Sequence, residues 1–264
     1  MRLIQTVLPT AEPISTAELK AHMNVQITDD DTKIAALSAT ARRWVETFCR
    51  RQLVASTWEL RLDAYWPGVL TLPTPPLLAV SSIQYVDTAG STQTEAASVY
   101  TVDTDGLEGR ITLAYGQNWS DTRDDYNAVT VTYVAGSATP FTAVAGTDVL
   151  TWGVHTPTDG ERVKLTNSGG TLPAGLSTNT DYYVIDSAGS TCKLSATSGG
   201  VAIDITDAGT GTHFINAVPE AARHAIMMMA AHWYEHAEAV TDGFTPYTVP
   251  MGVKDLLWSE RTGL

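Results

Sequence analysis

The chain changes composition abruptly between residues 137 and 218. This stretch holds 11 of the 20 glycines and 15 threonines, but only 10 charged residues. It follows a strand-like run that ends at Gly136, and it precedes an apolar helical pattern that begins at Pro219. The flanks therefore read as one domain opened at a loop. The sequence predicts a host of residues 1–136 and 219–264 with an all-β module, 137–218, inserted in it.

The charge balance limits the possible partners. The chain carries 29 acidic and 16 basic residues, a formal net charge of −13. A protein that reads nucleic-acid sequence needs a basic footprint, which this composition does not supply. An acidic wall beside passing DNA would instead repel phosphate and prevent sticking. The two cysteines, Cys49 and Cys192, predict reduced thiols and no disulfide framework.

Neither export nor a membrane span is indicated. The apolar run at 3–8 is short, and proline and acidic residues follow it in place of a signal cleavage site. The longest apolar run, 225–231, is too short to cross a bilayer, which takes about 20 residues. We therefore expect a chain that folds in a cytoplasm and has no membrane partner.

Three segments predict the helical body of the host. Ser15 and Glu18 form a capping box that opens a short helix ending near Met23. Acidic residues 29–31 favour the start of a longer helix, because carboxylates stabilise the positive end of a helix. A third helix is expected at 219–240, with proline in its first turn. The apolar stripes of the two longer helices are Ile34, Leu37, Ala41, Trp44, Val45 and Phe48, and Ile226, Met229, Ala230, Trp233, Ala237 and Val240.

Residues on these helices also predict contacts between subunits. Met227 and Met228 add apolar surface outside the stripe of the third helix, and His236 falls beside its Trp233 as a packed interface histidine does. Arginines 42, 43, 50 and 51 cluster at the end of the second helix. They compensate the helix dipole, contact an acidic partner or, least favoured, contact DNA. We assign to the subunit interface Met227, Met228, Trp233, His236, Arg42 and Arg43.

Short runs of alternating apolar and polar residues predict strands. In the host they lie at 57–63, 83–85, 99–102, 110–113 and 129–134. In the Gly/Thr-rich stretch they lie at 163–165, 182–185, 192–194 and 202–205. The expected fold class is α+β: a helical body with a small antiparallel β sheet or barrel, plus a separate inserted all-β domain.

One helical motif has the spacing of a zinc site. His232, Glu235 and His236 match H-x-x-E-H, the pattern of inverted zinc proteases, in which two imidazoles on one helix face hold the metal. A third ligand in a second helical setting is missing, so we favour a structural role for these histidines. A calcium site at the Asp-rich turn 121–125 is a weaker alternative. We expect no catalytic residue, no metal, no cofactor and no enzyme activity.

The C-terminal segment places much apolar surface among helix breakers, which is costly to leave in water. Either it folds back on its own subunit or it docks on a partner, and we assign it to docking. The residues concerned are Phe244, Tyr247, Val249, Pro250, Met251, Val253, Leu256, Leu257 and Trp258.

In their order and number, the motifs of the flanks resemble the head–tail connector (adaptor) family of tailed phages. The motifs are LKAHM at 19–23, DDD at 29–31, IAAL at 34–37, ARRWVE at 41–46, TWELRLD at 57–63, LPTPPL at 72–77, AYGQNW at 114–119, VTVTYVAG at 129–136, AHWYE at 231–235 and VPMGV at 249–253. The stretch 137–218 resembles Gly/Thr-rich β modules of phage virion proteins, through GTLPAGL at 170–176 and YYV at 182–184.

The resemblance implies a ring of about twelve copies in the neck of a phage or phage-like particle. Such a ring binds the portal protein on one side and a stopper or tail-completion protein on the other, and genomic DNA passes through its lumen without specific binding. C-terminal segments of these adaptors commonly engage the portal, so we expect the tail residues named above to dock there. An insertion as large as 137–218 departs from the simpler family pattern.

Two other classes stay open at this point. One is a zinc metallopeptidase that uses the His232, Glu235 and His236 motif. The other is a surface or glycan-binding β module at 137–218, which requires an export that the N-terminus does not support. Under the favoured reading, the function lies in the flanks, and the host should fold without residues 138–217.

Overall fold

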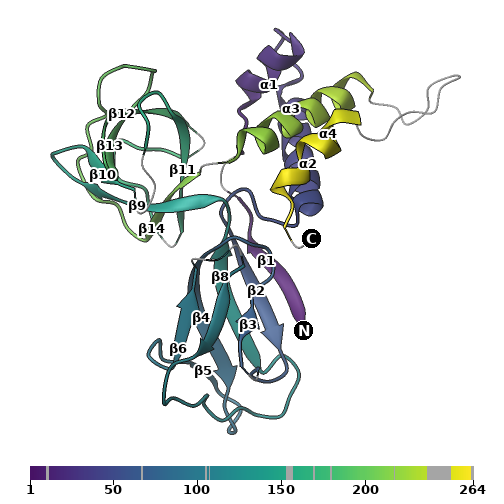
Figure 1. Cartoon of the computed structure of the whole chain (residues 1–264), viewed down its shortest axis with the longest axis vertical. Coiled ribbons are helices and arrows are strands. Elements are labelled where there is room, and N and C mark those ends of the chain that lie inside the picture. The colour runs from purple at the N-terminus through teal and green to yellow at the C-terminus, as the bar shows by residue number, and fades with distance from the viewer. Residues whose placement is uncertain are drawn as a thin grey trace, which may run out of the picture. The chain divides into compact units, whose positions relative to one another are not determined.

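The computed structural model describes residues 1–9, 12–66, 68–104, 106, 108–152, 157–168, 170–178, 180–216, 218–236 and 251–262 (Figure 1). The chain forms two compact units. The first consists of Met1–Pro9 and Val54–Ser137, and the second of Thr10–Leu53 and Ala138–Leu264. Helices and antiparallel sheets both occur, so the fold is α+β as expected.

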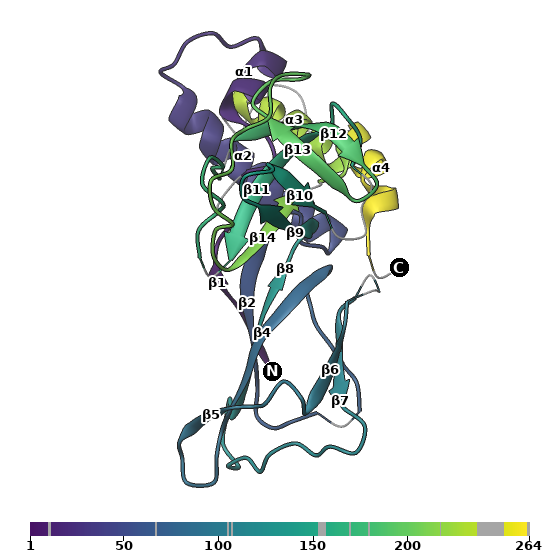
Figure 2. The same ribbon diagram turned by 90° about the vertical axis from the view of Figure 1, so that its left-hand side faces the viewer.

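The first unit is built of two antiparallel sheets around one core (Figure 2). The larger sheet has the order β1-β2-β8-β4-β5, formed by Arg2–Val7, Ser56–Leu62, Val129–Ala135, Leu77–Val86 and Thr92–Thr94. The smaller sheet has the order β3-β7-β6, formed by Leu70–Thr71, Arg110–Leu113 and Tyr100–Asp103. Apolar residues of both sheets, such as Leu60, Val131 and Ile111, are fully buried between them. The five strands expected in the host are confirmed as β2, β4, β6, β7 and β8.

The helices belong to the second unit. They are α1 (Thr16–Met23), α2 (Asp31–Cys49), α3 (Glu220–Glu235), α4 (Met251–Leu256) and a short 3₁₀ helix, η1 (Trp258–Glu260). The predicted N-cap of α1 is confirmed, because the Ser15 hydroxyl accepts a hydrogen bond from the Glu18 amide at 3.2 Å. α2 packs on both α1 and α3, and α4 packs on α3. No helix among the described residues is long and apolar enough to span a membrane.

The buried face of α2 differs from the predicted stripe. Ile34, Ala41 and Val45 are buried as expected, but Leu37, Trp44 and Phe48 are only half-buried. The buried face turns instead toward Ser38, Arg42 and Cys49. Apolar periodicity predicts the buried face of a helix only approximately, and here the buried Arg42 is paired with Glu12 and Glu46.

Residues 138–216 form a closed six-stranded barrel in the order β10-β13-β12-β11-β14-β9. Its core consists only of residues between Phe141 and Ile215, with Trp152 at 0 % exposure among them. The predicted strands at 163–165, 182–185 and 192–194 are confirmed as β11, β12 and β13, whereas 202–205 makes only one isolated bridge, Ala202 to Ser195. In chain order the strands are β9 (Ala138–Val144), β10 (Val149–Thr151), β11 (Arg162–Ser168), β12 (Asp181–Ala188), β13 (Thr191–Ser195) and β14 (Thr212–Asn216).

The chain enters and leaves the barrel through neighbouring strands. β9 pairs with β14, and Ala138 lies opposite Asn216. Just before this point, the backbone of Gly136 passes so close to Ala55 that a Cβ would lie 2.6 Å from the Ala55 nitrogen. A larger residue is therefore excluded at the end of β8. The barrel groups with the helices in the second unit, so the division into units differs from the predicted domain borders, and the inserted status of 137–218 stays a prediction.

Both cysteines lie buried in the second unit, Cys49 on α2 and Cys192 on β13, and neither forms a disulfide. Burial raises the pKa of each thiol to about 11. Because the thiolate is the reactive form, both side chains behave as inert apolar groups near neutral pH.

We predict that deleting residues 138–217 and joining Ser137 to Val218 leaves a folded body. Paired residues of antiparallel strands lie about 5 Å apart, so the two ends of the barrel lie close enough together for a direct join. Circular dichroism and thermal unfolding should show a cooperative transition, and the oligomeric state should match that of the full chain.

A second deletion, residues 138–188 only, serves as the control. It leaves two barrel strands without their core, and we expect aggregation because their apolar faces lose all cover. If the 138–217 deletion aggregates as well, the barrel is an integral part of the body and the insertion model is wrong.

Candidate interaction surfaces

The C-terminal segment contributes to the core of its own chain. Val253 and Leu257 are fully buried, and the Thr262 hydroxyl donates a hydrogen bond to the Arg50 carbonyl at 2.8 Å. The reason given for docking, an otherwise free apolar tail, is therefore wrong for Val253 and Leu257. Leu256 is half-buried, whereas Trp258 keeps 55 % of its surface exposed.

The other residues of the predicted docking tail are not placed by the structure. Phe244, Tyr247, Val249 and Pro250 lie outside the described residues, as does the side chain of Met251. Their docking role stays a prediction.

The adjacent arginines of α2 have different surroundings. Arg42 is only 5 % exposed, and its guanidinium pairs with Glu12 at 2.7 Å and with Glu46 at 2.7 Å. Burial acts against the charge, but the hydrogen bond that Arg42 donates to Glu12 and the charge of Glu46 outweigh it and raise the pKa of Arg42. Arg42 therefore has its partners within its own chain. Arg43 is exposed, and no acid among the described residues forms an ion pair with it.

Arg43 lines an open groove between α2 and α3, which we call the α2–α3 groove. The groove has a volume of about 790 Å³ and brings together two of the predicted interface residues, Arg43 and Trp233. Trp44 also lines it, stacked on Phe48 with ring centroids 5.4 Å apart. The remaining lining residues are small and come from α2: Ala36, Ala39, Thr40 and Thr47.

Of the other predicted interface residues, Met227 and Met228 are half-buried. The terminal methyl of Met228 lies close to Gly252 of α4, at 4.0 Å from the point where a Cβ of residue 252 would stand. His236 follows the last residue of α3 and is exposed. A contact of Met227 or His236 with another subunit stays a prediction.

The zinc motif brings its two histidines close together. The rings of His232 and His236 have centroids 4.8 Å apart. Within the described residues, no group of three or more His, Cys, Asp or Glu side chains could hold a metal ion. The Asp-rich turn at 121–125 contains one exposed ion pair, between Arg123 and Asp125 at 4.0 Å.

A partly buried ion-pair cluster joins the barrel to the helices, and no local sequence pattern predicts it. The Glu18 carboxylate accepts hydrogen bonds from Arg162 of β11 at 2.5 Å and from Arg223 of α3 at 2.6 Å. Arg223 also donates to the Pro13 carbonyl at 2.7 Å. Burial raises the pKa of Glu18, although the positive charge of Arg162 acts in the opposite direction. The carboxyl of the expected capping box thus binds two arginines distant in sequence.

A second contact lies beside this cluster. The Lys164 ammonium of β11 donates to the Glu12 carbonyl at 2.9 Å and lies 3.7 Å from the Asp181 carboxylate. Burial lowers the pKa of Lys164, and the charge of Asp181 opposes that shift. Because Glu12 also holds Arg42, the segment before α1 contacts both the barrel and α2.

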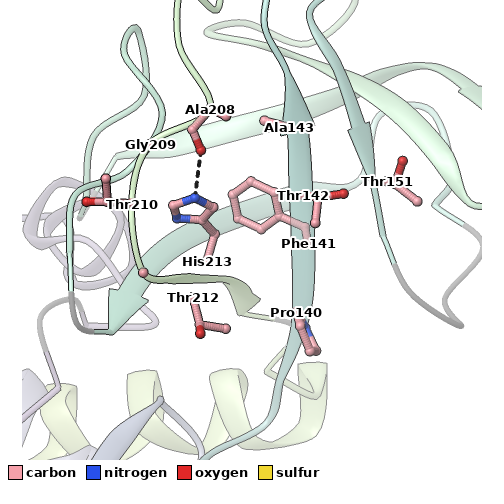
Figure 3. Close-up of a pocket in the computed structure, with 11 residues that line it drawn as sticks. Pro140, Phe141, Thr142, Ala143, Thr151, Ala208, Gly209, Thr210, Thr212 and His213 are labelled. Carbon is pink, nitrogen blue, oxygen red and sulfur yellow. Dashed lines mark hydrogen bonds between the residues drawn. The ribbon is translucent and has the colours of Figure 1, made fainter.

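The barrel carries a pocket of about 600 Å³ between β9, β14 and the 208–211 loop (Figure 3). The rings of Phe141 and His213 face each other there, with centroids 5.3 Å apart. Both nitrogens of His213 have partners, the Ala208 carbonyl at 2.9 Å and the Asn167 amide at 2.8 Å. In the neutral ring these partners place the proton on Nε2, because the Asn167 amide donates to Nδ1. None of the described residues that line the pocket is Asp, Glu, Lys or Arg.

No family model matches the chain, and no curated protein matches it. Solved structures do. A chain in the neck of an empty gene transfer agent (GTA) particle, computed with C6 symmetry, has a TM-score of 0.58 and 16 % identity. A chain in the virion of a native GTA particle has a TM-score of 0.57 and 17 % identity. A chain in the neck of a native GTA particle, computed with C12 symmetry, has a TM-score of 0.55 and 16 % identity.

In all three comparisons the match covers 100 % of this chain and 97 % of the other. The shared fold therefore extends over the whole chain, and the barrel lies within the matched region.

We predict that Glu18→Gln lowers the free energy of unfolding by about 1–3 kcal/mol, because it leaves two partly buried arginines, with side chains 30 % and 10 % exposed, without their carboxylate. Glu220→Gln is the matched control. Glu220 also contacts Arg223, at 3.4 Å, but its side chain is 88 % exposed against 19 % for Glu18. We expect the control to change stability by less than about 0.5 kcal/mol.

Urea unfolding of both variants measures the difference. Equal effects of the two substitutions would show that the ion pairs of Glu18 with Arg162 and Arg223 do not stabilise the contact between the barrel and the helices.

Proposed function

We propose that this chain is a structural protein of the neck of a phage-like particle, a head–tail adaptor that carries no enzyme activity. The observation that carries the proposal is the likeness of fold, over the full length of the chain, to chains in the necks of GTA particles. The order of motifs in the flanks, which resembles that of phage adaptors, supports it independently.

The proposed assembly is a closed ring of about twelve copies with a lumen for DNA. The neck of the native GTA particle was computed with C12 symmetry, and rotational symmetry of that kind repeats one contact surface around an axis. The formal charge of −13 suits a ring through which DNA passes, because acidic walls repel phosphate. The proposed partners are the portal protein on one side and a stopper or tail-completion protein on the other.

The location and the copy number can be tested together. We expect electron microscopy of purified particles from the producing host to show this chain as one closed ring in the neck. Mass spectrometry of the same particles should give about twelve chains each, in line with a closed cyclic assembly. Absence of the chain from particles that have complete necks would contradict the proposal.

We also propose that the exposed part of the C-terminal segment docks on the portal. Truncation after Asp242 is a poor test, because it also removes Val253 and Leu257 from the core. Trp258→Ser is sharper, since this indole is half exposed and aromatic side chains dominate the energy of many interfaces.

We expect Trp258→Ser to weaken co-purification with the portal protein by about tenfold or more, the loss of one interface hot spot. Lys254→Ala, at an exposed position of α4, is the control and should bind the portal like the parent chain. Both variants should keep the melting temperature of the parent. Unchanged portal binding by Trp258→Ser would refute docking through η1.

A further inference from the structure

The α2–α3 groove is an apolar surface that the described part of the chain leaves uncovered. Its floor follows one face of α2, where Ala36, Ala39 and Thr40 follow one another at helical spacing. Small side chains let the backbone of a partner approach closely. The groove is open to solvent, unlike the enclosed sites that bury most of a small ligand.

The two threonine hydroxyls of the groove are already satisfied within α2. The Thr40 hydroxyl donates to the Ala36 carbonyl, and the Thr47 hydroxyl donates to the Arg43 carbonyl, each at 2.8 Å. A partner therefore has no acceptors to supply for these hydroxyls. What the groove presents is methyl groups, the indoles of Trp44 and Trp233, and the Arg43 guanidinium. Tryptophan and arginine are the residue types most enriched among energetically dominant interface residues.

Charge identifies the occupant. Arg43 lacks an ion pair among the described residues, although Arg42 beside it has two. The chain as a whole has 29 acidic and 16 basic residues, so a second copy offers carboxylates in excess. Nucleic acid is a poor match, because the groove offers a single cation to a polyanion.

We propose that the α2–α3 groove receives an adjacent copy of this chain, with a carboxylate of that copy facing Arg43. The contact is heterologous: the groove of one subunit meets a different surface of the next, which is the arrangement that closes a ring. The proposal rests on the ring assembly proposed above, and it assigns the subunit contact to specific residues of that ring.

Two neighbouring alanines provide a matched pair of variants. Ala35 and Ala36 are both exposed on α2, but only Ala36 lines the groove. Ala36→Glu places a carboxylate in the apolar floor, and Ala35→Glu makes the same change of charge outside it. We expect particles from the Ala36→Glu strain to contain at least about tenfold less of this chain than those from the Ala35→Glu strain. The two purified variants should have equal melting temperatures.

The occupant is identified by cross-linking in assembled particles. A photoreactive p-benzoyl-phenylalanine in place of Ala36 should give a covalent dimer of this chain on irradiation, and the same amino acid in place of Ala35 should not. A cross-link to a different virion protein overturns the proposal, and so does the absence of any cross-link.

These outcomes separate the two proposals. If the chain forms a ring in the neck but Ala36→Glu assembles like Ala35→Glu, the groove assignment is wrong and the adaptor function stands. If the chain is absent from the particle neck, the adaptor function fails, whatever the cross-linking at position 36 shows.

Discussion

Three segments of the second unit meet at one partly buried carboxylate. Glu18 binds Arg162 from the barrel and Arg223 from α3, so a single side chain of α1 joins a strand and a helix that are distant in sequence. Taking these charges partly out of water is costly, and burial raises the pKa of Glu18 although the charge of Arg162 lowers it. A pair of this kind adds less to stability than its short distances suggest. Its larger effect is to disfavour every other arrangement, because any displacement leaves an unpaired charge out of water.

The local features of the fold could be predicted from the sequence, and the long-range polar contacts could not. The Ser15 cap and strands such as β7 depend on neighbouring residues, and both were predicted correctly. Glu18 shows the limit: its spacing from Ser15 marks a capping box, yet its carboxylate turns to arginines that no local pattern connects to it. The 202–205 run fails for a related reason. Ile203 and Ile205 pack into the barrel core, but a strand also needs a neighbouring strand to pair with, and this run forms one bridge, between Ala202 and Ser195.

At the candidate surfaces, too, the sequence predicts the element on which a residue lies but not the contacts that its side chain makes. Arg42 and Arg43 are equivalent in the sequence, but one is enclosed by Glu12 and Glu46 and the other lines the α2–α3 groove. Composition alone could not separate the two options for the C-terminal segment, because folding back and docking both cover apolar surface. The structure separates them residue by residue: Val253 and Leu257 serve the core, and Trp258 remains exposed.

The position of the groove residues bears on where the function lies. Every described residue that lines the groove comes from α2 or α3, and thus from the flanks of the Gly/Thr-rich stretch. The barrel is closed on itself, so it leaves no strand edge free to pair with another chain. Its ends leave through paired residues of β9 and β14, so they stay close together whatever sequence the barrel carries between them. In the proposed assembly α2 and α3 make the contact, and the barrel contributes through Arg162 and Lys164, which bind Glu18 and Glu12 beside the helices.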